Sequence, residues 1–469
     1  MLSALLQSAC SPQLSFLSSQ LPPLLRLDII SAVPHELAWR ILLYLDATSL
    51  CRASQVCKLW NQLAEDDVLW HHMCEQHIEK KCTKCGWILP LMYRGPMVQR
   101  PAEDCRGPPS SSTSSASRSG NASVDSGNAA SEATKQPRRR WKDIYAERLV
   151  VERNWRRLKC ECRQLGSGER VTSMFLLNDH LVTGSADGVV QLLHMKTGNL
   201  VKLLLGHTGG ITAVQMDHAK IISGSLDGTA RIWSIATGEC IRTIQHSSPI
   251  VHLHFEGTIL ALANTANEIR VIDCSTKSCE SLSIAPTHDL KKIHVWGPDH
   301  IFILTATLAQ LWNWRNKMCI RKLSCDAEYK DMVIASPFNP AYEPFLKPLD
   351  SNPDAGRSLC KDAPVVLLST ENSVFRWRFL DRKQADPMCS NEDVTAMYAN
   401  AYRVMFGNRS GQLKREALNN HGEPSSTWFR PNVANRHISK MAFNDTQLVV
   451  HYLEPNEMFV FDFSQRSSS

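Results

Sequence analysis

The feature that most constrains the fold is a repeat of forty residues in the middle of the chain. GSADG at 184–188 recurs as GSLDG at 224–228. Gly206-His207 opens the second unit, and an altered Gln245-His246 opens the third. A repeat of this length, punctuated by glycine-rich turns, is typical of architectures in which each unit buries its apolar surface against its neighbours.

Within each unit, short apolar runs are separated by Gly or Asp-Gly turns. Ile211, Ala213 and Val214 form one such run, and Ile221 and Ile222 form the next. This alternation predicts four short antiparallel strands per unit. A four-stranded repeat of this length, with a GH dipeptide and a Trp-Ser dipeptide, is the signature of a WD40-type propeller blade.

The most regular unit, 206–245, carries a set of polar residues at positions that face one another across a blade. We expect a hydrogen-bond network formed by His207, Ser223 or Ser225, Asp227 and Trp233. Such a network satisfies buried polar groups and holds the turn in place, so its predicted role is structural and not catalytic.

The strand pattern continues to the end of the chain and predicts seven blades, with eight as the alternative. The blades are expected at 170–210, 211–249, 250–289, 290–325, 326–388, 392–430 and 435–465. The fifth is enlarged by a proline-rich stretch that is interpreted as a surface loop. Residues 160–165 precede the first blade and are expected to close the ring as the outer strand of the last, which leaves no open edge.

The N-terminal third of the chain has a different character. Residues 101–134 are rich in Ser, Gly, Ala, Asn and Pro, which predicts a disordered insertion. From 141 to 157, apolar residues fall at helical spacing between charges and predict an amphipathic connecting helix. Between 34 and 92 we expect three or four short helices, with Pro34 at a helix start.

Several segments resemble one family. VPHELAWRILLYLDATSLCRASQVCKLWNQLAEDDVLW, from Val33 to Trp70, resembles an F-box. CEQHIEKKCTKCGWILPLM and RRRWKDIYAERLVVERNWRR are similar to the segments that follow it in the cell-cycle F-box/WD40 receptors of fungi and animals. This resemblance implies a small all-α F-box domain and connecting helix followed by an all-β WD40-type propeller. The implied domains are a partial dimerisation-like helix at 1–30, the F-box and following helices at 31–95, a disordered linker at 101–140, the connecting helix at 141–160 and the propeller at 161–465.

The resemblance further implies a non-catalytic adaptor of a Skp–cullin–F-box (SCF) ubiquitin ligase. The F-box would bind the Skp subunit, and through it the cullin–RING core, while the propeller rim would bind the degron of a protein substrate for proteasomal degradation. The residues expected to bind Skp are Pro34, Leu37, Ile41, Leu42, Leu45, Leu50, Val56 and Trp60. A unit this small has surplus apolar surface to offer. The alternatives are that these residues form the unit's own core and that the protein is a WD40 scaffold without a role in degradation.

Family members of the cell-cycle type hold phosphorylated degrons with arginines on the blade tops. In this chain the family's arginine positions carry Thr172, Thr212, Val251, Lys291 and Thr395 at the blade entry and Ala186, Leu226 and Arg409 in the turn. The candidate substrate-binding residues are Arg231, Arg270, Lys291 and Arg409. A propeller that reads an unphosphorylated or differently charged motif is favoured over one that binds phosphate.

Two further clusters leave alternatives open. Cys74, His77, Cys82 and Cys85 have the residue types and rough spacing of a small zinc site, but nothing in the resemblance calls for a metal or a cofactor, and none is expected. The basic run from Lys135 to Lys142 is interpreted as a nuclear import signal, with a nucleic-acid contact or a solvated linker as alternatives. The expected location is the nucleus and cytoplasm.

Composition and motifs exclude other classes of protein. The net charge is +6, and residues 135–163 alone carry eleven Lys or Arg against four Asp or Glu, so the rest of the chain is nearly neutral. No apolar run approaches about 20 residues, which argues against membrane insertion. No GxSxG, GxxxxGK[ST] or HExxH motif is present. The segment SPQLSFLSSQLPPLLRLDIISAVP is similar to the end of a dimerisation element, so a weak homodimer is the alternative to a monomer.

Overall fold

The computed structural model divides the chain into two compact units, Met1–Leu149 and Val150–Ser469. The residues that it describes are 10–13, 15, 28–77, 140–167, 170–275, 279–283, 289–325, 327–335, 365–379, 385–390, 393–400, 403–417, 428–431, 436–454 and 456–465. Most of the segment 1–30, most of the linker 101–140 and the proline-rich stretch of the fifth blade lie outside these ranges. In the part of the chain that is described, no helix has the length and apolar character needed to cross a membrane.

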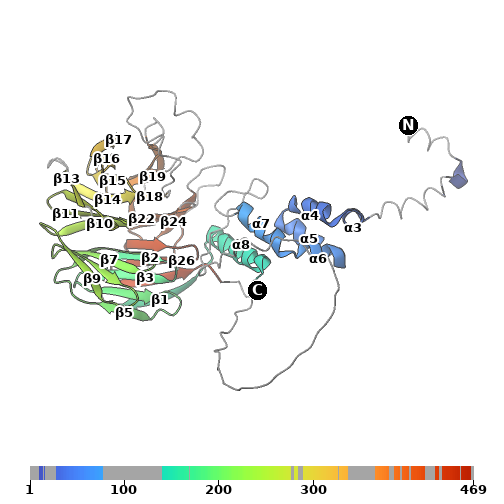
Figure 1. Ribbon diagram of the computed structural model, residues 1–469, viewed down its shortest axis with the longest axis horizontal. Coiled ribbons are helices and arrows are strands. Elements are labelled where there is room, and N and C mark those ends of the chain that lie inside the picture. Colours follow the sequence, from blue (N-terminus) through green and yellow to red (C-terminus); the bar gives the residue numbers. More distant parts are fainter. Residues whose placement is uncertain are drawn as a thin grey trace, which may run out of the picture. The chain divides into compact units, whose positions relative to one another are not determined.

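Short helices form the first unit (Figure 1). They are α3 (Ile29–Ala32), α4 (His35–Leu43), α5 (Ala47–Ala53), α6 (Lys58–Ala64) and α7 (Asp67–His77). Pro34 precedes α4 in an extended conformation, φ −53° and ψ 148°, as expected of a proline at a helix start. The Asp46 carboxylate caps α5 by accepting a hydrogen bond from the Ser49 backbone N–H at 3.3 Å. Four helices therefore begin between residues 34 and 77, within the predicted number.

The predicted connecting helix is observed as α8 (Trp141–Arg157), and the division between the two units falls inside it. Its first half packs in the apolar core of the helical unit, where Tyr145 lies 5.4 Å from the ring of Trp70. Trp70 also donates a hydrogen bond to the Ala64 carbonyl at 2.7 Å. Residues 141–149 thus belong to the helical unit, although the sequence placed the whole helix between domains.

Seven antiparallel sheets form the second unit, which confirms seven blades over eight. The first four blades are β2 (Val171–Leu177), β3 (His180–Ser185), β4 (Val190–His194) and β5 (Leu200–Leu204); β6 (Ile211–Met216), β7 (Lys220–Ser225), β8 (Thr229–Ser234) and β9 (Cys240–Gln245); β10 (Ile250–Glu256), β11 (Ile259–Asn264), β12 (Glu268–Asp273) and β13 (Cys279–Ser283); β14 (Leu290–Trp296), β15 (His300–Thr305), β16 (Leu308–Asn313) and β17 (Met318–Ser324). The other three are β18 (Asp331–Ile334), β19 (Val366–Ser369), β20 (Ser373–Trp377) and β21 (Asp386–Ser390); β22 (Val394–Ala399), β23 (Arg403–Asn408) and β24 (Leu413–Ala417); β25 (Ile438–Phe443), β26 (Gln447–Tyr452) and β27 (Glu457–Asp462) with β1 (Glu161–Ser167).

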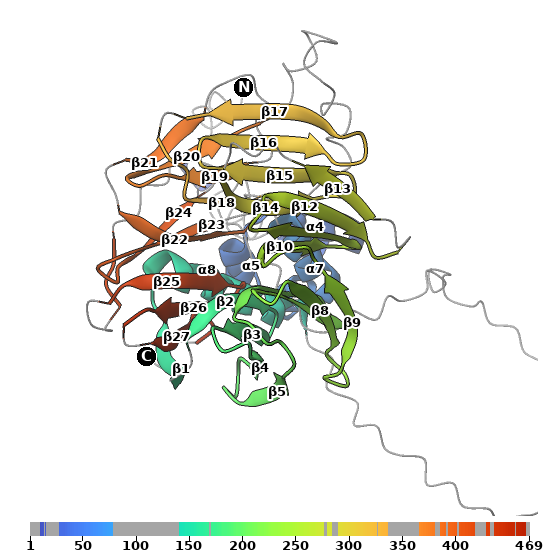
Figure 2. The ribbon, with the colours of Figure 1, turned by 90° about the vertical axis from the view of Figure 1, so that its left-hand side faces the viewer.

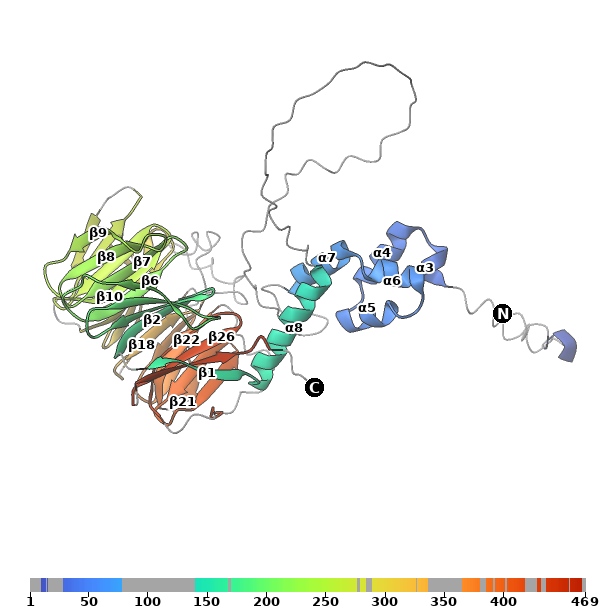
Figure 3. The same cartoon turned by 90° about the horizontal axis from the view of Figure 1, so that it is seen from below.

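The ring closes as the sequence predicts. Strand β1 follows α8 in the chain (Figure 3) and pairs antiparallel with β27, with Cys162 opposite Phe461 and Gln164 opposite Phe459. One apolar cluster then joins Leu165 and Leu181 to Val449 in the last blade. Because the first and last segments of the propeller share one sheet, the last blade has its fourth strand from the start of the ring.

The second half of α8 is anchored to the closed ring. Trp155 is fully buried and stacks on Phe463 with ring centroids 3.7 Å apart. Its indole N–H donates to the Asp445 carbonyl at 2.8 Å, and the Asn154 amide donates to the Phe463 carbonyl at the same distance. The stacking and the two hydrogen bonds make residues 150–157 part of the propeller unit.

Candidate functional site

Two regions carry the residues that the sequence analysis singled out, and the first is the surface of helix α4. Leu37, Ile41 and Tyr44 follow one another at spacings of four and three residues, so they share one side of the helix. Their exposed fractions are 49%, 42% and 79%. These three residues are named the apolar face of α4. Solvent-exposed apolar side chains grouped in this way are the usual mark of a surface that binds another protein.

The eight residues predicted to bind Skp divide into three groups. Pro34, Leu37, Ile41 and Val56 are exposed, Leu45 and Trp60 are half-buried, and Leu42 and Leu50 are buried. Leu42 and Leu50 lie in the unit's own apolar core, because the opposite side of α4 and the middle of α5 face inward. The alternative interpretation, a structural core, thus applies to these two residues.

Three exposed apolar residues of the helical unit were missed. Tyr44, Leu59 and Val68 expose 79%, 37% and 58% of their surfaces. The signal for Tyr44 was present in the sequence, because it comes three residues after Ile41 on the same helical face. Leu59 and Val68 lie near the starts of α6 and α7, and only the packing of the helices shows that they are left outside the core.

The candidate zinc ligands are only partly described. Cys74 is fully buried, and burial raises the pKa of its thiol to about 11. A thiol with so high a pKa disfavours the thiolate form that zinc binds. Cys82 and Cys85 lie outside the described residues, and among those that are described no group of three or more His, Cys, Asp or Glu is placed to hold a metal.

The second region is the propeller, and its most regular blade contains the predicted network. Trp233 donates to the Ser223 hydroxyl at 2.9 Å, Ser223 donates to His207 Nε2 at 2.8 Å, and His207 Nδ1 donates to the Asp227 carboxylate at 2.8 Å. Burial lowers the pKa of His207, so the imidazole is neutral at pH 7. Ser225 does not belong to this series of hydrogen bonds from Trp233 to Asp227. Its hydroxyl donates to the Gly209 carbonyl at 2.8 Å. The network is buried and structural, as predicted.

The propeller contains a cavity of about 650 Å³, named the channel, which is lined mainly by the inner strands of its seven blades. In Figure 2, β2, β10, β14, β18 and β22 lie toward the middle of the ring, and β5, β9, β17 and β21 lie at its periphery. In six inner strands the pairing shifts register after the first residue, which is the mark of a β-bulge. Bulges re-aim the side chain at the irregular position, and the residues after these shifts line the channel.

The four predicted substrate-binding cations are not brought together. Lys291 and Arg409 line the channel, where Lys291 pairs with Asp289 at 2.7 Å and Arg409 pairs with Asp393 at 3.3 Å. Arg231 and Arg270 are not part of this lining. Arg231 lies 5.8 Å from the ring centre of Trp233, and Arg270 donates to the Gln245 carbonyl at 3.2 Å. Only two of the four therefore face a common space.

The channel also holds residues that the sequence analysis did not nominate. They are Lys292, Lys330, Asp331 and Lys440 together with His252, His254 and His294. Burial, with Lys292 as a second cause, lowers the pKa of His252 to about 4 and that of His254 to about 3. These imidazoles are therefore neutral at pH 7. A signal was available, since Lys292, Lys440 and His252 each stand two residues after the first apolar residue of an inner strand.

Comparison with known proteins gives the class that this architecture defines. Residues 30–76 match the family model described as F-box-like, and residues 198–234 match the model described as WD domain, G-beta repeat. The matched ranges lie within the helical unit and the propeller respectively. The chain therefore combines an F-box-like domain with a seven-bladed WD40 propeller, and it resembles the F-box/WD40 receptors.

Two of the relatives that match are fungal proteins. A probable E3 ubiquitin ligase complex SCF subunit sconB from Talaromyces stipitatus is 35% identical over 269 residues, which cover 52% of this chain and 34% of that protein. An F-box protein from Saccharomyces cerevisiae is 34% identical over 244 residues, covering 52% of this chain and 29% of that protein. The chain thus spans about a third of the length of these relatives.

One solved structure supports the fold of the propeller. The β-propeller domain of Cps50 (Swd1) from Myceliophteria thermophila superposes with a TM-score of 0.50 at 13% sequence identity. The superposition covers 65% of this chain and 99% of that domain. At this level of identity the likeness shows the propeller fold alone.

Proposed function

We propose that this protein is a substrate-recognition adaptor of an SCF-type E3 ubiquitin ligase. In this role the F-box-like domain binds the Skp subunit, the propeller binds a protein substrate, and the chain itself carries out no chemistry. Ubiquitin transfer is accelerated because the substrate is held close to a conjugating enzyme that other subunits carry. The names of the Talaromyces and yeast relatives, an SCF subunit and an F-box protein, support this role.

The observation that carries the proposal is the apolar face of α4 inside the F-box-like region. Leu37, Ile41 and Tyr44 are exposed although the helix behind them is packed through Ala38 and Leu42. A helix whose two sides are both apolar has one side for its own core and one for a partner helix. We assign the Skp contact to this face with Pro34 and Val56, and not to the buried Leu42 and Leu50.

The direct test is a pull-down with purified Skp subunit, using the full chain. A double Leu37→Asp, Ile41→Asp variant places two charges on the apolar face of α4 and should weaken Skp binding at least about a hundredfold, as expected for central interface residues. The matched control is Ile241→Asp on strand β9, because Ile241 is 64% exposed but belongs to the propeller. The control should bind Skp as the wild type does.

The outcome separates the adaptor from a scaffold. If the wild type does not bind Skp, or if the double variant binds as well as the wild type, the proposal is wrong. If Skp binds but proteins captured by the propeller are not turned over faster, the WD40 scaffold without a degradation role replaces the adaptor. Circular dichroism of each variant shows whether a loss of binding reflects a loss of folding.

We also propose that the protein is present in both the nucleus and the cytoplasm. The support for nuclear entry is the basic run from Lys135 to Lys142. Only Arg140, Trp141 and Lys142 of this run are described. Lys142 forms an ion pair with Glu65 and lies 5.6 Å from the ring centre of Trp70, so this lysine also has a structural role in the helical unit.

A further inference from the structure

One outer strand of the propeller exposes an unusually apolar surface. Strand β5 and the residue after it carry four large apolar side chains, Leu200, Val201, Leu203 and Leu205, and between 45% and 62% of each is exposed. They are half of the eight large apolar side chains that are exposed in the described part of the propeller. These four residues are named the apolar edge of β5. Single exposed apolar residues are common, but four of them on one strand indicate a contact surface.

The backbone of β5 is open on one side. β5 is the last strand of its sheet, in the order β2-β3-β4-β5, and Figure 2 shows it at the outer border of its blade. Among the described residues its strand partner is β4, with Lys202 opposite Leu192, and the ladder shifts register at Val201. The regular part of the edge therefore runs from Lys202 to Leu204, with Leu205 directly after it. Along such an edge, alternate N–H and C=O groups point away from the sheet and can pair with another strand.

The two faces of β5 have different surroundings. Leu204 is buried in the apolar cluster that the first blade shares with the second, and the Lys202 amine donates to the Ala236 carbonyl of the second blade. Because side chains alternate along a strand, Leu203 and Leu205 project from the opposite face. The single charged residue of β5 is thus turned toward the second blade, and the exposed face is apolar.

Other outer strands carry groups that hinder the addition of a strand. Strand β9 exposes Arg242, β17 exposes Lys322, β21 exposes Pro387 and β1 exposes Glu161. Charged side chains and proline on edge strands keep natural sheets from pairing with other chains. The exposed face of β5 has no such group, so the propeller leaves this edge unprotected although it protects these four.

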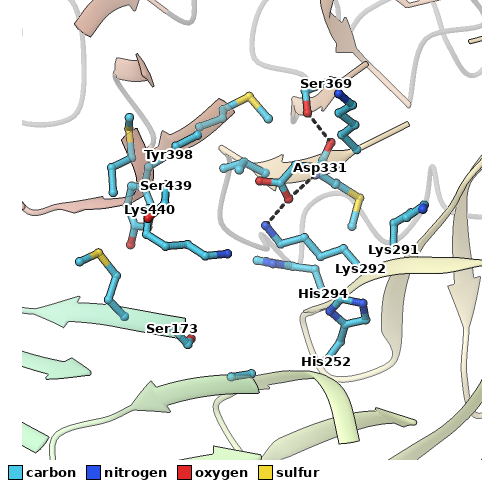
Figure 4. A pocket seen from close by; sticks show the side chains of 18 of the residues that line it. Ser173, His252, Lys291, Lys292, His294, Asp331, Ser369, Tyr398, Ser439 and Lys440 are labelled. Carbon is cyan, nitrogen blue, oxygen red and sulfur yellow. Dashed lines mark hydrogen bonds and ion pairs between the residues drawn. The ribbon is translucent and has the colours of Figure 1, made fainter. Parts of the chain in front are cut away.

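The apolar edge of β5 is separate from the regions described above. The channel is lined by side chains from several blades, among them Lys292 and Lys440 (Figure 4), and by none of the four residues of the edge. The edge belongs to the propeller unit, whereas the apolar face of α4 belongs to the helical unit. A partner at β5 would therefore bind apart from both the channel and the Skp contact.

The exposed area favours a single added strand over a second copy of the protein. Two copies paired through β5 would bury eight half-exposed aliphatic side chains, which present about 400 Å² of apolar surface if a whole side chain presents roughly 100 Å². Stable interfaces between proteins bury about 1,200–2,000 Å². A short extended segment needs less area, because its main chain forms hydrogen bonds along the edge.

We propose that β5 binds an extended segment of a partner protein as an added strand of the first blade. Main-chain hydrogen bonds to the edge from Lys202 to Leu205 would hold the segment in place. Apolar side chains at every second position of the segment would pack beside Leu203 and Leu205. The partner is thus recognised as a short strand-forming sequence that alternates apolar and polar residues and contains no proline.

The first test is fluorescence polarisation of the full chain with a labelled, capped peptide of alternating valine and threonine. The peptide should bind to the wild type. A second peptide of the same sequence carries N-methyl groups on all its internal amides and should bind at least tenfold more weakly, because it has lost the hydrogens that a strand ladder needs. Equal binding of the two peptides would show apolar contact without strand pairing and would overturn the proposal.

The second test changes the edge itself. Leu203→Lys places a charge at the centre of the apolar edge and should weaken the binding of the unmethylated peptide at least tenfold. The matched control is Ile241→Lys on β9, because Ile241 is exposed on the outer strand of the neighbouring blade. The control should bind the peptide as the wild type does. Thermal unfolding shows whether each variant folds, and Leu203→Thr replaces Leu203→Lys if the latter does not.

Two further results would overturn the proposal. One is a wild-type chain that does not bind the unmethylated peptide, and the other is a Leu203→Lys chain that binds it as tightly as the wild type. Sedimentation equilibrium without peptide tests the second copy. The wild type and Leu203→Lys should sediment alike, whereas a wild-type dimer that dissociates in Leu203→Lys would assign the edge to a second copy. Leu203→Lys should still bind Skp, so failure of this proposal is distinguishable from failure of the adaptor role.

Discussion

The helical unit and the propeller treat their apolar residues in opposite ways. The helical unit has six large apolar side chains exposed within residues 28–77, whereas the propeller has eight within its much longer described part. The propeller buries its strands between neighbouring blades and closes its ring with β1. Because a small unit has a high ratio of surface to volume, it buries a smaller share of its apolar residues. The helical unit therefore leaves a larger share of its apolar residues exposed, which fits the Skp contact proposed above.

The two units also differ in where they place charge. In the propeller, Glu152 at the end of α8 is buried and accepts from Arg403 at 2.9 Å, and Lys292 and Lys440 face the channel. In the helical unit, the ion pair of Lys142 with Glu65 is partly exposed. The propeller therefore brings charges from several blades to one cavity, whereas the helical unit carries this ion pair near its surface.

The largest expected effect tests whether α8 belongs to both units. Trp155→Ala removes the stacking on Phe463 and should lower the opening free energy of the propeller by about 3–5 kcal/mol. Native-state hydrogen exchange, read by mass spectrometry on the full chain, measures the opening free energy for peptides of each unit. The control is Leu200→Ala at an exposed site on β5, which should change the opening free energy of the propeller by less than about 0.5 kcal/mol. An equal loss of protection in residues 28–77 would break the distinction between the units.

A smaller effect separates the two sides of α4. Leu42→Ala empties a fully buried site and should cost the helical unit about 3 kcal/mol. Its neighbour Ile41→Ala should cost less than about 0.5 kcal/mol, because Ile41 is exposed and alanine favours a helix. The same exchange experiment gives both values. If the Ile41 variant proves as unstable as the Leu42 variant, the apolar face of α4 is part of the unit's own core.

The smallest effect per measured step is a difference in acid sensitivity. The pKa of His254 is lowered to about 3 by burial, so the folded propeller does not bind a proton that the unfolded chain binds below pH 6.5. The stability that this neutral imidazole contributes is therefore complete above pH 6.5 and is lost as the pH falls toward 3. His254→Leu should reduce the slope of propeller stability by about 1.4 kcal/mol per pH unit between pH 6 and 4. Urea unfolding at several pH values measures it, and an unchanged slope would contradict the burial of the imidazole.

Local patterns predicted much of the fold. The forty-residue repeat, the seven blades, the closing strand from 160–165 and the network around His207 all follow from periodicities and motifs in nearby sequence. Strand alternation and helical spacing depend only on neighbouring residues, so they are readable without knowing how distant segments meet. The placement of α8 was less accurate, because the contacts of Tyr145 and Trp155 divide a continuous helix between two units.

The sequence did not determine which candidate site residues lie together, for a reason visible in particular residues. The two candidates that stand at family positions, Lys291 and Arg409, line the channel, whereas Arg231 and Arg270, which were added as basic residues near strand ends, do not. Leu42 and Leu50 looked equivalent to Leu37 and Ile41 in the sequence, since all four are apolar and helical. Which of them faces the core depends on how α4 and α5 pack against α6 and α7. Apolarity alone does not distinguish a buried residue from one that is left exposed.

The sequence by itself determined a helical F-box-like region followed by a ring of blades, and it determined where that ring closes. Only the tertiary structure decided that the apolar face of α4 stays exposed and that Lys292 and Lys440 meet in one channel. The physical reason is that backbone periodicity is a local property, whereas the meeting of two side chains from β14 and β25 requires the whole ring to close. The charge in the channel is therefore a product of the closed fold.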